Sequence, residues 1–66
     1  MRLTVNGKDA EVPGGVTLAE VVRPLTPRTE GVAAAVDGVV VPRRLWADHE
    51  MTDGARVEVV VAVQGG

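Results

Sequence analysis

The residues with the clearest chemical potential are Gly65 and Gly66, which follow Gln64 where the sequence ends. A carboxylate is a poor acyl donor because its negative charge repels nucleophiles, but joining it to AMP makes a mixed anhydride that a sulfur nucleophile can attack. A partner that runs this reaction must enclose the carboxyl end, and glycine gives the slimmest backbone because it has no Cβ. Extended, residues 63–66 would project about 13 Å at ~3.3 Å per residue. A diglycine also fits a frayed chain end, so its interpretation depends on the fold that carries it.

Side chains that usually carry catalysis are scarce. The sequence has no cysteine and no serine, and His49 is its only histidine. No zinc set of Cys and His ligands can therefore form, and the usual acyl-transfer nucleophiles are missing, which leaves five threonines and Lys8. A net charge of −2 and a single aromatic residue argue against a nucleic-acid surface. We predict no catalytic residue and no metal site.

A length of 66 residues predicts a single domain, 1–66, with a flexible tail over 64–66. Its core must be built mainly from valine, alanine and leucine, because isoleucine, phenylalanine and tyrosine are absent. No apolar run approaches the roughly 20 residues of a membrane span, and the first residues lack the apolar stretch of a secretion signal. We expect a cytoplasmic protein that is a monomer when free and binds neither membranes nor nucleic acid.

The chain opens with the pattern of a β-hairpin. Leu3 and Val5 alternate with polar residues, which is typical of a strand with one buried face. Asn6-Gly7 follows and favours a type I′ turn, because both central residues of that turn need a positive φ. Residues 9–12 are then predicted to form the return strand.

A short helix is predicted next. Thr17 lies three residues before Glu20, the spacing of a capping box in which each side chain satisfies the other residue's backbone N–H group. We predict a helix over about 18–25 with a kink or a stop near Pro24. Proline removes one interior hydrogen bond and disfavours helical geometry at the preceding residue, Arg23.

The second half of the chain predicts three more strands. Residues 32–36 are apolar, and Asp37-Gly38 is a second hairpin signal that leads into the valines at 39–41. A turn of 3₁₀ helix is expected around Leu45 and Trp46. The longest strand is expected over 57–63, and its apolar residues on both faces favour a central position in the sheet.

The predicted order is hairpin, helix, strand pair and final strand. In such a chain the first and last strands can lie side by side at the centre of the sheet, with the helix packed across one face. We therefore predict an α+β protein with the β-grasp, or ubiquitin-like, fold and a mixed sheet of about five strands. On that fold, we interpret the diglycine as a reacting carboxyl end rather than as a frayed chain end.

The sequence resembles the ThiS family, the sulfur carrier proteins of thiamine biosynthesis, over nearly its whole length. The segment Val41-Pro42-Arg43, followed by Trp46, His49 and Asp53-Gly54, carries the resemblance together with the valine-rich strand and the terminal Gly65-Gly66. The diglycine is shared by every carrier of the superfamily, whereas the Val-Pro-Arg segment favours the thiamine branch.

The resemblance implies a route for the carboxylate of Gly66. A ThiF-like adenylyltransferase related to ubiquitin-activating enzymes would use ATP and Mg²⁺ to adenylate it. Sulfur drawn from cysteine through a desulfurase relay would convert the acyl-adenylate to a thiocarboxylate, and a ThiG-like thiazole synthase would receive that sulfur. Gln64 and Gly65 would give the partner access, and this chain would bind no cofactor of its own.

Other residues have more ordinary interpretations. We interpret Trp46 as a core residue, His49 as a structural or surface histidine, and Lys8 as solvent-exposed. Arg43 is a possible partner contact because of its place in the Val-Pro-Arg segment, whereas Arg44 is interpreted as solvated.

Two alternative functions remain open from the sequence. The first is the small subunit of molybdopterin synthase, another β-grasp carrier ending in Gly-Gly, although such chains are typically longer. The second is a plain β-grasp interaction module whose glycines are a loose end.

Overall fold

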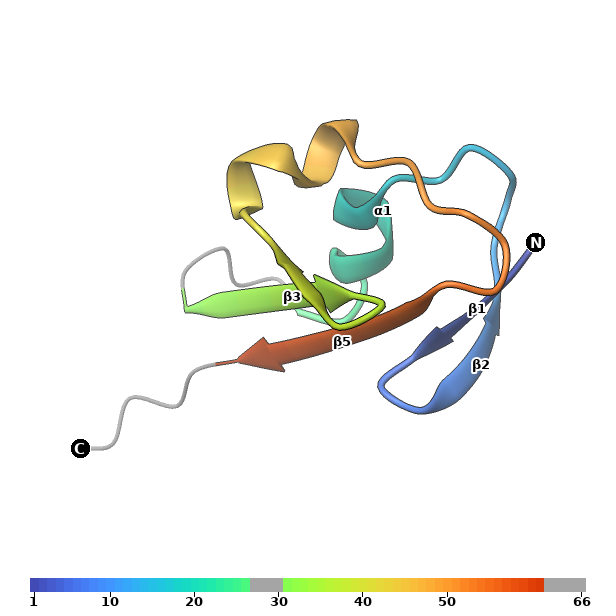
Figure 1. The fold of residues 1–66 in the computed structure, drawn as a ribbon, viewed down its shortest axis with the longest axis horizontal. Helices are drawn as coiled ribbons and strands as arrows, with labels where there is room; N and C mark the ends of the chain where they lie inside the picture. Colours follow the sequence, from blue (N-terminus) through green and yellow to red (C-terminus); the bar gives the residue numbers. More distant parts are fainter. Residues whose placement is uncertain (27–30, 62–66) are drawn as a thin grey trace.

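The computed structural model describes residues 1–26 and 31–61 of the chain. Their elements in chain order are β1 (Arg2–Val5), β2 (Lys8–Glu11), α1 (Leu18–Val22), β3 (Val32–Val36), β4 (Val39–Val41), the 3₁₀ helix η1 (Arg43–Asp48) and β5 (Arg56–Val61). The strands form one mixed sheet in the order β2-β1-β5-β3-β4. In Figure 1 both α1 and η1 lie over the same face of this sheet. The predicted β-grasp fold is confirmed.

The central strand is β5, as predicted from its apolar pattern. It pairs in parallel with β1, where Thr4 lies opposite Arg56 and Val5 opposite Val57. On its other side it pairs antiparallel with β3 along its whole length. The first and last strands of the chain are therefore neighbours in the middle of the sheet. Residues 62 and 63, which we also predicted to be in this strand, lie outside the described part of the chain.

Both predicted hairpin turns have the expected backbone. Asn6 and Gly7 have φ values of 49° and 82°, and Asp37 and Gly38 have values of 50° and 84°. A positive φ at both central positions is the requirement of a type I′ turn. The return strand β2 begins one residue earlier than predicted and ends at Glu11.

The start of α1 is confirmed and its end is corrected. The Thr17 hydroxyl accepts a hydrogen bond from the Glu20 N–H at 3.3 Å, and Glu20 Oε1 accepts one from the Thr17 N–H at 3.0 Å. This is the predicted capping box. The α-helix ends at Val22, three residues before the predicted boundary. Pro24 has no N–H with which to continue the helical hydrogen bonds.

Arg23 is helical although the proline that follows it disfavours this geometry. Arg23 has φ −52° and ψ −46°, and its N–H donates to the carbonyl of the residue four positions earlier. The chain then keeps turning, because the N–H groups of Leu25 and Thr26 both donate to the Val22 carbonyl, at 2.9 and 3.3 Å. These local hydrogen bonds outweigh the steric preference of a residue that precedes proline.

The core lies between the sheet and the two helices. Leu3, Leu18 and Val57 are fully buried at its centre. Trp46 is 7% exposed, and its indole Nε1–H donates to the Val41 carbonyl at 2.8 Å, which satisfies the one polar atom of a large buried side chain. The core interpretation of Trp46 is confirmed, as is the 3₁₀ helix that carries it. None of the helices found in residues 1–26 and 31–61 is long and apolar enough to span a membrane.

Removing the N-cap of α1 is expected to destabilise the fold. A helix of five residues is too short to form on its own, so it depends on its cap and on packing. We expect Thr17→Ala to lower the free energy of unfolding by about 1 kcal/mol, measured by urea denaturation followed by Trp46 fluorescence. Thr17→Ser keeps a hydroxyl and is expected to stay close to the original stability. Equal stability of Thr17→Ala and the original chain would contradict the role of the cap.

Candidate functional site

The candidate site is the C-terminal end of β5 and what surrounds it. The structure does not describe residues 62–66, so the predicted site residues Gln64, Gly65 and Gly66 lie outside its described part. The last described residue, Val61, precedes Gly66 by five positions. What the structure shows is how the strand that leads to Gly66 is held.

The second half of β5 has a neighbour on each side, as far as Val61 on the β3 side and as far as Val59 on the other. On the β3 side, the register pairs Val61 with Val32 at the last position of the strand. On the other side β1 ends at Val5, and the next residue, Asn6, makes the hydrogen bonds to β5. The Asn6 N–H donates to the Val57 carbonyl at 2.8 Å, and Asn6 Oδ1 accepts from the Val59 N–H at 2.8 Å.

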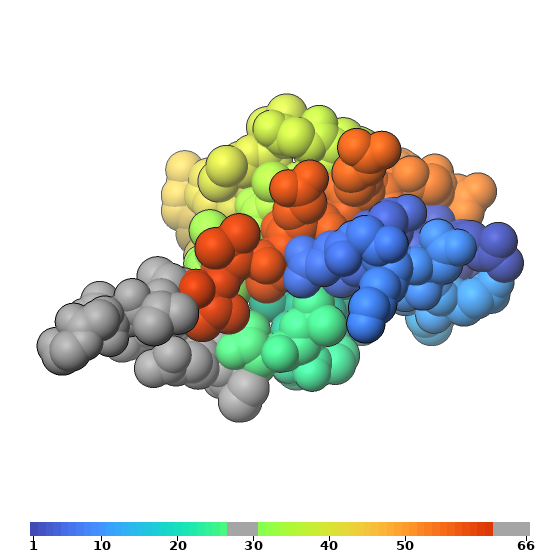
Figure 2. Space-filling model, turned by 90° about the horizontal axis from the view of Figure 1, so that it is seen from below, coloured from blue at the N-terminus to red at the C-terminus, as the bar shows by residue number. Residues whose placement is uncertain are grey.

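The two faces of this end differ in exposure. Val59 and Val61 are half-buried on the side of the core, whereas Val60 points to the open face of the sheet and is 63% exposed. Figure 2 shows this open face, with β5 lying between the β1–β2 hairpin and the yellow-green β3–β4 segment. Beside Val60 is its exposed partner Ala33, and Val40 on β4 is 67% exposed. The surface next to the strand end is therefore apolar.

Arg43 lies at the same end of the sheet as the end of β5. Ala34 on β3 pairs with Val59 of β5 on one side and with Val41 of β4 on the other. Both pairings are antiparallel, so β4 and β5 run in the same direction, and Val41 lies level with Val59 across the sheet. Arg43 follows two residues after Val41 as the first residue of η1 and is exposed. Figure 1 shows η1 beginning on the side of the sheet where β5 ends.

The remaining predicted residues take no part in this end. Lys8 is exposed at the start of β2, as predicted. His49 is half-buried, and its backbone carbonyl accepts a hydrogen bond from the Leu18 N–H at 2.8 Å, which ties the end of η1 to the start of α1. Within residues 1–26 and 31–61, His, Asp and Glu side chains form no group of three that could hold a metal ion.

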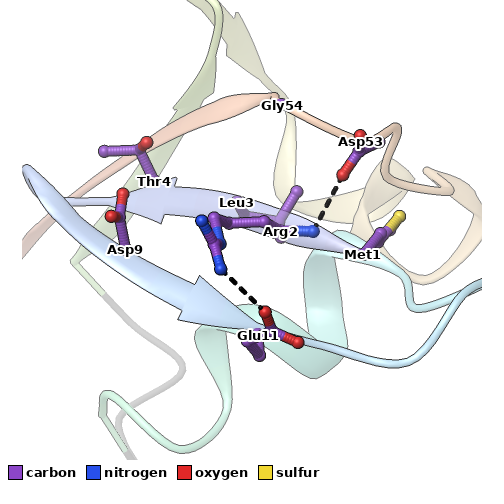
Figure 3. A pocket seen from close by; sticks show the side chains of 8 residues that line it. All are labelled: Met1, Arg2, Leu3, Thr4, Asp9, Glu11, Asp53 and Gly54. Atoms are coloured by element: carbon purple, nitrogen blue, oxygen red, sulfur yellow. Dashed lines mark hydrogen bonds and ion pairs between the residues drawn. The ribbon is translucent and has the colours of Figure 1, made fainter.

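A shallow hollow lies at the opposite end of β5. Figure 3 shows its lining, which is Met1, Arg2, Leu3, Thr4, Asp9, Glu11, Asp53 and Gly54. The Arg2 guanidinium pairs with Glu11 at 3.1 Å, and the Arg2 backbone N–H donates to Asp53 Oδ1 at 2.8 Å. The length of β5, about 16 Å at 3.3 Å per residue, separates this hollow from the strand end. Arg2 and Glu11 form an ion pair in this lining, and none of the lining residues lies at the end of β5.

The family model of the ThiS family matches residues 3–66. The chain belongs to the ThiS family. The match covers the whole of β5 and continues through Gly66, so the diglycine falls within the family-like region. The predicted resemblance is confirmed.

Similar proteins agree with this membership. The chain is 30% identical over 66 residues to the sulfur carrier protein ThiS of Escherichia coli strain K12, with 100% of each chain covered. It is similar to the crystal structure of the thiamine biosynthesis protein ThiS from Geobacter metallireducens, with a TM-score of 0.82, 30% identity and all of both chains covered. A solution structure of a thiamine biosynthesis protein from the same organism gives a TM-score of 0.78 and 32% identity, covering 100% of this chain and 88% of that one.

ThiS membership decides between the functions that the sequence left open. The protein is a sulfur carrier of thiamine biosynthesis, and as a carrier it works with partner enzymes. The thiamine branch is thereby favoured over the small subunit of molybdopterin synthase and over a plain interaction module.

The sequence analysis did not predict two features of the surroundings of the β5 end. Asn6 was interpreted only as a turn residue, and nothing local in the sequence indicates that its amide also reaches β5. The exposed valines were missed as well, although the three consecutive valines of β4 carried a signal. In a strand with one covered face, adjacent residues point to opposite sides, so one of them must face outward.

The hollow of Figure 3 is expected to contribute neither to carrier function nor much to stability. The side chains of Arg2 and Glu11 are 65% and 76% exposed, and such solvated pairs contribute about 1 kcal/mol or less. We expect Glu11→Gln to change the free energy of unfolding by less than about 1 kcal/mol and to leave sulfur transfer in a reconstituted assay unchanged. A large loss of transfer by a stably folded Glu11→Gln variant would assign this hollow a function.

Proposed function

We propose that the carboxylate of Gly66 is the reacting group of this carrier. An adenylyltransferase related to ubiquitin-activating enzymes binds ATP and Mg²⁺, and the carboxylate attacks the α-phosphorus to give an acyl-adenylate and pyrophosphate. The protein itself supplies the acyl group and binds neither the nucleotide nor the metal. It acts in the cytoplasm as a co-substrate rather than as an enzyme.

A persulfide sulfur then attacks the activated carbonyl, and AMP leaves. A desulfurase relay draws that sulfur from cysteine, and a thiol reductant supplies the two electrons that cleave the resulting acyl disulfide to a C-terminal thiocarboxylate. Thiazole synthase takes the sulfur for the thiazole ring and releases the carrier with its carboxylate restored. Gln64 and Gly65 form the stalk on which the reacting atom enters each partner, because glycine allows the backbone the closest approach.

The observation that carries this proposal is the match to the ThiS family through Gly66. The fold supports it, because the strand that leads toward Gly66 is the centre of the sheet and has hydrogen-bonding neighbours on both sides. The chemistry supports it as well, since the sequence contains no cysteine or serine nucleophile that could do the work in place of the terminus.

Arg43 is proposed as a contact for the activating partner. It is exposed at the end of the sheet where β5 ends, and a guanidinium there can form paired hydrogen bonds with an acidic side chain of a protein docked at the tail. Its neighbour Arg44 is also exposed and has the same charge, which makes it a matched control.

The central test is the mass of the intact protein. After incubation with the adenylyltransferase, ATP, Mg²⁺ and a sulfur source, we expect an increase equal to the difference between sulfur and oxygen. Fragmentation is expected to place the change on Gly66. Deleting Gly66 is expected to abolish the change and leave the fold intact, as checked by the urea midpoint. A mass change on any other residue, or none at all, contradicts the proposal.

A second test compares Arg43→Ala with Arg44→Ala. If Arg43 contacts the partner through a charged hydrogen bond, its loss is expected to raise the KM for the carrier about tenfold, the effect of a contact worth 1.5 kcal/mol or more. Arg44→Ala is expected to change the same KM less than twofold. Equal effects of the two variants would indicate only a general need for positive charge.

A further inference from the structure

Within the described residues, β1 does not extend far enough to pair with the second half of β5. The parallel ladder between β1 and β5 extends only to Val5 and Val57. In a regular parallel pair, one residue donates its N–H to a carbonyl of the neighbouring strand and accepts, at its own carbonyl, the N–H two residues further on. Asn6 makes the first of these bonds, from its N–H to the Val57 carbonyl at 2.8 Å. The type I′ turn then directs the chain into β2.

The side chain of Asn6 supplies the second bond. Its Oδ1 accepts from the Val59 N–H at 2.8 Å, in the place that a backbone carbonyl would occupy in a continued ladder. One short side chain thereby extends the pairing of β5 past the end of β1. Asn also tolerates the φ of 49° that the turn requires, so the two demands on this position are met by the same residue.

We propose that Asn6 is a positioning residue for the carboxyl terminus. By holding Val59, it extends the two-sided pairing of β5 to two residues before the end of the strand, so that the chain leaves Val59 in a defined place and direction when the activating partner binds. Without it, β5 beyond Val57 would be paired with β3 alone and would open more often. The inference rests on the proposed function, because it concerns how Gly66 is presented for adenylation.

The other hairpin turn provides a matched control. Asp37 has a φ of 50°, its N–H donates to the Arg56 carbonyl at 2.8 Å, and its Oδ1 accepts from the Arg56 N–H at 3.0 Å. The two turns thus make the same kinds of contact with β5 from opposite sides. Asp37 does so at the beginning of the strand, far from the tail, whereas Asn6 does so in its second half.

The test uses three variants of the full chain: Asn6→Gly, Asn6→Asp and Asp37→Gly. Glycine suits the positive φ of either turn and deletes only the acceptor, whereas aspartate at position 6 keeps an acceptor oxygen. Loss of one hydrogen bond corresponds to a factor of about 2 to 10. For Asn6→Gly we expect amide hydrogen exchange at Val59 to accelerate by that factor. We expect the KM for the carrier in adenylation, measured by pyrophosphate release, to rise similarly with little change in kcat.

The controls separate positioning from folding. Asn6→Asp is expected to restore both the slow exchange and the low KM. Asp37→Gly is expected to lower the urea midpoint as much as Asn6→Gly does and yet leave the KM unchanged. Provided that the original chain is adenylated, two results would overturn the inference. One is an unchanged KM in Asn6→Gly, and the other is an equal increase in KM in Asn6→Gly and Asp37→Gly. Absence of adenylation in the original chain would instead refute the proposed function itself.

Discussion

The structure depends on one pairing, the parallel contact between the first and last strands at the centre of the sheet. β1 and β5 are joined by hydrogen bonds from Thr4 to the Ala55 carbonyl and from Asn6 to the Val57 carbonyl. Leu3 and Val57, which these strands carry, are fully buried. Because β3 closes the other side of β5, the last strand cannot move without disturbing the core. The strand that leads toward the diglycine is therefore held from both sides at the centre of the sheet.

The core is small, and hydrogen bonds to backbone carbonyls join the elements that surround it. Trp46 is the one large aromatic residue in a core of small side chains, and its indole N–H donates to the carbonyl of Val41 at the end of β4. The Leu18 N–H binds the His49 carbonyl and so joins α1 to the end of η1. Such cross-links matter in a domain of this size, which buries only about 60% of the surface of its unfolded chain.

Local patterns predicted most of the elements, and they failed at the end of α1. The turns at Asn6-Gly7 and Asp37-Gly38 and the Thr17–Glu20 capping box were predicted correctly, because each depends on residues adjacent in the chain. The end of α1 was predicted three residues too late, because Pro24 has no N–H with which to continue the helical hydrogen bonds. For the candidate site, the residue types were enough to propose a reacting group, whereas the contacts of Asn6 with β5 could not be predicted from them.

The amino-acid sequence alone determined the strand periods, the turn residues, the absence of cysteine and serine and the presence of the diglycine. Tertiary structure alone decided that the Asn6 amide reaches Val59, that Arg43 lies at the end of the sheet where β5 ends, and that Val40 and Val60 face outward. The physical reason is how far apart along the chain the interacting residues are. A turn or a cap is settled by forces between neighbours in the chain, but 53 positions separate Asn6 from its partner, and only the packed sheet brings the two together.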